Sequence, residues 1–104
     1  MGMALRTSET QREGMPVIEL SGRLDAMSSE EFQRLLMEKI DETQGDLVLD
    51  CKELEFVSSA GLRTFLAAQK NLHSKGFQLK LTHTGEEIMK VLVMTGFDKF
   101  LRIE

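Results

Sequence analysis

The chain of 104 residues is 41% hydrophobic, which fits one globular domain with its own core and excludes a disordered segment. Its net charge of −4 comes from interspersed acids and bases rather than a basic stripe, which argues against direct nucleic-acid binding. The apolar runs are too short for membrane insertion and the single Cys51 excludes an intramolecular disulfide, so one domain over residues 1–104 in the reducing cytoplasm is expected.

The start of the chain predicts a β-hairpin. A strand is expected over residues 3–10, with Met3, Leu5 and Thr7 on one face, and a second strand is expected over residues 16–21. The turn residues at 11–14 connect the two strands, so they are expected to pair in antiparallel fashion.

A first helix is predicted to begin at Ser28, which fits a capping box together with Glu31. The apolar side chains that follow recur at helical spacing and form one stripe, made of Phe32, Leu35, Leu36 and Ile40. Gly45 ends this segment, and the continuous apolar run at residues 47–49 is typical of a strand covered on both faces.

The second half of the chain alternates helices and strands. A helix is predicted from residues 58–61 to Gly76, then a strand over 77–81, and then a helix over about 86–95 that ends at Gly96. A last short strand is predicted from three apolar residues, Phe100, Leu101 and Ile103. Two strands followed by this alternation predict an α/β domain with a mixed sheet.

Two hydroxyl groups stand where a strand gives way to a helix, at Ser58 and Ser59. Phe56 and Val57 precede them and are expected to face the core. The free N–H groups of a helix N-terminus point outward with partial positive charge, so they stabilise an anion placed there. A phosphoserine therefore fits this position well.

The small residues Ala60 and Gly61 lack bulk, which leaves the backbone open to close approach by a partner. The alternative is that Ser58 or Ser59 only caps the helix, because serine is among the favoured N-cap residues. Both interpretations are compatible, since a capping serine can also be modified.

Three segments in a fixed order resemble the STAS family (sulfate transporter and anti-sigma factor antagonist) over about the whole chain. They are Ser-Gly-Arg-Leu-Asp at residues 21–25, Leu-Val-Leu-Asp at 47–50, and Leu-Glu-Phe-Val-Ser-Ser-Ala-Gly-Leu at 54–62. The resemblance implies the STAS fold, a mixed sheet of four to five strands with about three to four helices packed against it.

The resemblance is to the stand-alone anti-sigma factor antagonist type, which works by partner switching. Such a protein binds an anti-sigma factor that is also a serine kinase, and this binding releases the sigma factor. The kinase then phosphorylates the antagonist on a serine at the start of the helix and the complex dissociates, until a PP2C-type phosphatase restores the antagonist. The resemblance implies no catalytic activity of its own and no cofactor.

The family pattern is Asp-Ser-Ser/Ala-Gly-Leu, and aligning it on Gly61-Leu62 places the phosphorylated residue at Ser59. Ser58 then stands where the family has Asp, which removes a negative charge beside the target. Asp25 matches an acidic family position and is expected near Ser59, either orienting its hydroxyl or bonding local N–H groups at a helix entry. The expected partner-binding residues are Asp25, Ser58, Ser59, Ala60, Gly61 and Arg63.

Other reactive side chains give weaker signals. Asp50 ends a strand and is expected in a turn or cap role, since the sequence nominates no further ligands for a metal. Cys51 is expected in the core, and His73 and His83 at the surface without a catalytic partner. An enzyme is therefore disfavoured, and the main alternative function is a STAS subunit that binds the ATPase of an ABC-type lipid transporter.

Overall fold

The computed structural model describes residues 5–104, so Met3 of the first predicted strand lies outside it. The elements are β1 (Leu5–Arg12), β2 (Met15–Leu24), α1 (Ala26–Glu42), β3 (Leu47–Val57), α2 (Ser59–Ser74), β4 (Leu79–Thr82), α3 (Glu86–Thr95), the 3-10 turn η1 (Phe97–Lys99) and β5 (Arg102–Ile103). The predicted mixed sheet and its alternating helices are confirmed. Over the same residues, no helix is both long and apolar enough to span a bilayer.

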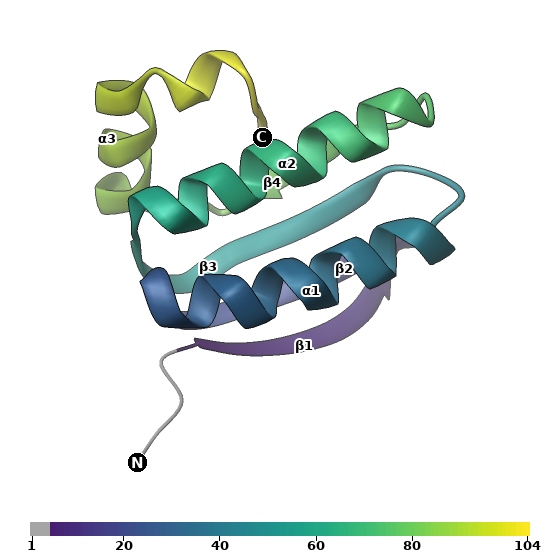
Figure 1. The fold of residues 1–104 in the computed structure, drawn as a ribbon, viewed down its shortest axis with the longest axis horizontal. Helices are drawn as coiled ribbons and strands as arrows, with labels where there is room; N and C mark the ends of the chain where they lie inside the picture. The colour runs from purple at the N-terminus through teal and green to yellow at the C-terminus, as the bar shows by residue number, and fades with distance from the viewer. Residues whose placement is uncertain (1–4) are drawn as a thin grey trace.

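The five strands lie in the sheet in the order in which they occur in the chain. β1 and β2 are antiparallel, and the turn between them uses Glu13 (φ 52°) and Gly14 (φ 80°), both left-handed as a tight hairpin requires. Every later pair is parallel. The strands β2, β3 and β4 therefore end at one edge of the sheet, where α1, α2 and α3 begin (Figure 1).

The main core lies between the sheet and the pair of helices α1 and α2, which cover one face (Figure 1). Phe32 of α1 meets Phe65 of α2 edge to face, with ring centroids 6.4 Å apart. The predicted stripe of α1 turns toward this core, with Phe32, Leu36 and Ile40 buried and Leu35 packed at its margin.

β3 contains two bulges that change which of its residues face the helices. Its pairing with β2 shifts by one residue twice, between Glu19 and Ser21 and between Gly22 and Arg23 of β2. The core residues of β3 are therefore spaced by two and then by three, at Leu47, Leu49, Cys51, Leu54 and Val57.

The prediction that Phe56 faces the core together with Val57 is wrong, because successive residues of a strand point to opposite faces. Val57 is buried as expected, but Phe56 points away from the helices, is 37% exposed, and carries the Arg23 guanidinium 4.3 Å above its ring.

The predicted start of the first helix is also wrong. The helix begins at Ala26, and Asp25 is its N-cap. The Ser28 N–H donates to the Asp25 carboxylate and the Asp25 N–H donates to the Ser28 hydroxyl, each at 2.9 Å. Ser28 therefore belongs to a capping box as predicted, but as its third helical residue rather than its cap, and Glu31 has no part in it.

Candidate functional site

The candidate site lies where β2 and β3 end and α1 and α2 begin. The Ser58 N–H donates to the carbonyl of Leu24 at 2.9 Å, which ties the two strand-to-helix connections together. Asp25 directly follows Leu24, so it lies close in space to Ser58, the residue before the Ser59 that it was predicted to approach. Each is the N-cap of its helix.

The hydroxyl of Ser58 is already engaged. Its backbone is extended (φ −88°, ψ 173°), and its Oγ accepts a hydrogen bond from the Gly61 N–H at 3.2 Å. This satisfies one of the N–H groups that a helix start leaves unpaired. The capping role that the sequence left open between the two serines therefore belongs to Ser58.

Ser59 is the first residue of α2 and is exposed. Its hydroxyl takes part in none of the hydrogen bonds found between side chains of residues 5–104. The two serines thus differ in chemistry, because Ser58 is a half-buried cap and Ser59 presents a free hydroxyl at the positive end of a 16-residue helix.

Gly61 has a different role from the one predicted. It is buried, and a Cβ added to it would lie 2.8 Å from side-chain carbons of both Leu24 and Val57. Its missing side chain therefore lets the first turn of α2 rest on the sheet, and does not open the backbone to a partner. Ala60 is half-buried, whereas Arg63 is exposed one turn into the helix.

Asp25 is held by its local bonds. Its Oδ1 accepts from both the N–H and the hydroxyl of Ser28, at 2.9 and 3.0 Å. These hydrogen bonds, the backbone one first, hold the pKa of the Asp25 carboxyl below its usual range. The helix-entry role is therefore present in the structure, while a contact between Asp25 and a partner stays a prediction.

An exposed methionine beside the site was missed by the sequence analysis. Met27 lies in the first turn of α1 and is 86% exposed. At 100° per residue, Met27 lies on the opposite side of the helix from Leu36 of the buried stripe. This spacing is the sequence signal from which its exposure could have been predicted. A large apolar side chain this exposed is typical of an interaction surface when it lies next to others.

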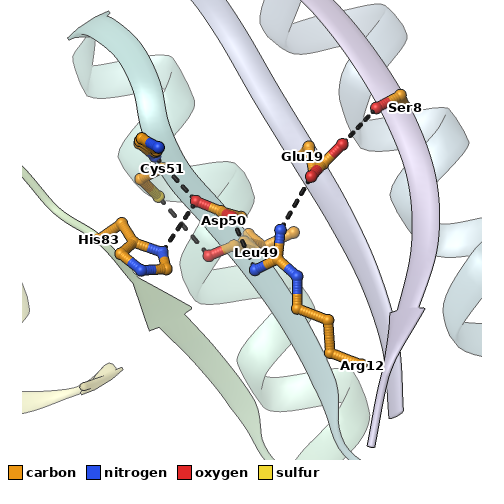
Figure 2. Close-up of polar contacts among 8 residues, drawn as sticks. Ser8, Arg12, Glu19, Leu49, Asp50, Cys51 and His83 are labelled. Atoms are coloured by element: carbon orange, nitrogen blue, oxygen red, sulfur yellow. Dashed lines mark hydrogen bonds and ion pairs between the residues drawn. The ribbon is translucent and has the colours of Figure 1, made fainter. Parts of the chain in front are cut away.

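A polar cluster occupies the face of the sheet that α1 and α2 leave uncovered (Figure 2). Asp50 of β3 is at its centre, with a side chain only 6% exposed, and its Oδ2 lies 2.7 Å from Nη1 of Arg12. Arg12 also reaches Glu19 at 2.8 Å, and Glu19 accepts from Ser8 at 2.8 Å. The cluster therefore joins β1, β2 and β3.

Asp50 stays ionised in spite of its burial. Burial raises the pKa of its carboxyl, but the Lys52 N–H at 3.0 Å and the Arg12 guanidinium outweigh that effect and lower it. The prediction that Asp50 ends a strand in a turn or cap role is wrong, because β3 continues to Val57 and Asp50 lies inside it, beside the first bulge that supplies the Lys52 N–H.

Of the remaining reactive residues, His83 belongs to the polar cluster, because its Nδ1 lies 3.2 Å from Oδ1 of Asp50. Burial raises the pKa of the Cys51 thiol to about 12, and both histidines are exposed as predicted. In the described part of the chain, no three His, Cys, Asp and Glu side chains converge as metal ligands would.

The chain is similar to known proteins along nearly all of its length. The model of the STAS domain matches residues 7–104. The anti-sigma F factor antagonist of Paenibacillus polymyxa is 28% identical over 102 residues, which cover 97% of this chain and 87% of that protein.

Solved structures share the fold. An anti-sigma factor antagonist from Mycobacterium paratuberculosis has a TM-score of 0.84 at 21% identity, covering 95% of this chain and 84% of its own. The antagonist SpoIIAA, in its unphosphorylated form, has a TM-score of 0.78 at 20% identity, covering 97% and 88%. Its phosphorylated form from Bacillus has a TM-score of 0.71 at 20% identity, covering 97% and 91%. With its mixed five-stranded sheet and a family match from residue 7 to the last residue, the chain belongs to the STAS domain family.

Proposed function

We propose that this protein is an anti-sigma factor antagonist that is switched by phosphorylation of Ser59. In its unmodified state it binds an anti-sigma factor with serine kinase activity and so releases a sigma factor. The observation that carries the proposal is the free hydroxyl of Ser59 at the exposed start of α2. Relatives that share the family are named as antagonists, and one of them is described in phosphorylated and unphosphorylated forms.

The partner surface in this proposal surrounds Ser59. Asp25, Ser58 and Ala60 lie around it, Arg63 extends from the next turn, and Met27 supplies apolar area from α1. Gly61 supports this surface from below rather than contacting the partner.

Phosphorylation adds about −1.5 to −2 charges to Ser59. The helix N-terminus accommodates the new charge without refolding, so the effect is at the surface. A partner that packs against a small neutral hydroxyl then meets a bulky dianion, and steric conflict with desolvation weakens the complex. A PP2C-type phosphatase reverses the modification. In this proposal the protein catalyses no reaction itself. Binding and phosphorylation take place in the cytoplasm.

The test is phosphosite mapping after incubation with the cognate kinase and ATP, together with calorimetric titration of the anti-sigma factor. Ser59→Ala should stay folded, bind the partner and take up no phosphate, while Ser59→Asp should stay folded and bind poorly. Ser58→Ala is the matched control, because it removes the cap, at a cost of about 1 kcal/mol in stability, and leaves the acceptor.

Phosphate on Ser58 in place of Ser59 would contradict the assignment of the acceptor. If neither serine is phosphorylated and the ATPase of a lipid transporter is the partner recovered, the proposed function is wrong.

A further inference from the structure

The connection from β4 into α3 passes through His83, whose backbone is left-handed (φ 56°). In residues 5–104, the other non-glycine residue with positive φ is Glu13, where the hairpin turn demands it. His83 follows a parallel strand and no hairpin requires its conformation. A left-handed backbone is unfavourable for a residue with a side chain, so the surroundings of His83 must hold it there.

The side chain of His83 is 58% exposed and contacts Asp50. The Nδ1 atom of His83 lies 3.2 Å from Oδ1 of Asp50, and the carboxylate can only accept, so Nδ1 carries the proton. Asp50 is itself immobilised by Arg12 at its other oxygen and by the backbone of Lys52 (Figure 2). The buried carboxylate is thus a fixed point on β3 to which the β4–α3 connection is attached.

The backbone conformation of His83 sets the direction in which the chain enters α3. Glu86, the first residue of α3, follows three residues later, and the main contacts of α3 are with β3 and η1. α3 lies at the same end of the molecule as the starts of α1 and α2 (Figure 1). It carries two large apolar side chains in exposed positions, Val93 (54%) and Met94 (78%).

We propose that Asp50 and His83 are positioning residues, whose hydrogen bond holds α3 against β3 at the end of the molecule where α2 begins, so that α3 contacts the same partner as Ser59. The inference rests on the proposed function. Its basis is the distribution of exposed apolar side chains, because Met27 belongs to α1 and Val93 and Met94 belong to α3, and both helices lie at the end of the molecule where α2 begins (Figure 1). A partner that covers Ser59 and Met27 can also contact α3 only if α3 stays in this position.

Two substitutions of His83 separate its hydrogen bond from its backbone conformation. His83→Gly removes the bond but adopts positive φ freely, so its denaturation midpoint should equal or exceed that of the parent protein. His83→Asn is the rescue variant, since asparagine tolerates positive φ and its amide nitrogen takes the place of Nδ1. Glu13→Gly is the matched control at the other left-handed residue, away from α3.

Hydrogen exchange and calorimetric titration of the anti-sigma factor supply the two measurements. In His83→Gly the amides of residues 86–95 should exchange faster and the Kd should rise at least five-fold, while His83→Asn and Glu13→Gly should match the parent protein in both. Parental α3 exchange and affinity in His83→Gly would overturn the proposal. Faster exchange along the whole chain with a lower midpoint would also overturn it, because the role would then be general stability.

The exchange measurement needs no partner, so it separates the two proposals. If the parent protein binds no anti-sigma factor, the proposed function fails, while local loosening of α3 in His83→Gly and its rescue in His83→Asn still support the positioning role.

Discussion

Replacing Gly61 by alanine tests the packing beneath the site. The new Cβ would lie 2.8 Å from Cγ and Cδ2 of Leu24 and 2.8 Å from Cγ2 of Val57. Leu24 is fully buried and Val57 is 4% exposed, so neither neighbour has room to withdraw. Overpacking of this kind costs about 1–3 kcal/mol, whereas alanine is better than glycine inside a helix by about 1 kcal/mol. The steric effect should therefore win, with a net loss of about 1 kcal/mol.

Thermal denaturation followed by circular dichroism measures this loss. For a domain of this size, 1 kcal/mol corresponds to a fall in Tm of about 4–8 °C. Gly45→Ala is the control, because a Cβ there meets nothing within 4 Å, and it should leave Tm unchanged or slightly raised. If Gly61→Ala proves as stable as the parent protein, the reasoning about close contact between α2 and the sheet is refuted.

Three further predictions follow from the burial and charge of single residues. Cys51, with its pKa raised to about 12, should resist iodoacetamide at pH 8 until the protein is unfolded by urea, and rapid labelling of the native protein would contradict its burial. Asp50→Asn should lower the free energy of unfolding at pH 7 by about 1–2 kcal/mol. Because the folded pKa of Asp50 is lowered, the difference from the parent protein should shrink as the pH falls below about 4, and urea titrations that show a constant difference would argue against an ionised Asp50. Met27→Ser and Arg63→Glu should each weaken anti-sigma factor binding in calorimetry while urea midpoints stay near the parent value, and a loss of stability without a loss of affinity would remove these residues from the partner surface.

The elements and their order were predictable because their signals are local. Apolar spacing in α1, the stops at Gly76 and Gly96, and the two serines at the start of α2 each act within a few residues. The same locality explains the error at the start of α1. Asp25 with Ser28 and Ser28 with Glu31 have the same spacing, and only the end of β2 at Leu24 decides which pair forms the cap.

The features that the sequence did not reveal depend on distant partners. The bulges of β3 arise from its pairing with β2, so the three-residue spacing of its core positions from Cys51 to Leu54 and Val57 has no local signal. The bonds of Asp50 to Arg12 and His83 join parts of the chain that are far apart in sequence, and each residue taken alone is typical of a surface or turn position. The inward role of Gly61 was hidden for the same reason, since it depends on contact with Leu24 at the end of β2.

The sheet order that repeats the chain order also has a consequence for synthesis. When β3 emerges from the ribosome, the β1–β2 hairpin that it pairs with has already been synthesised. In the same way, β3 is present before β4 emerges, and β4 is present before β5. No strand has to wait for a later segment to be inserted between it and its partner. The domain can thus assemble from the N-terminus one strand at a time, and the end that carries Ser59 takes shape once α2 has emerged, before α3 is in place.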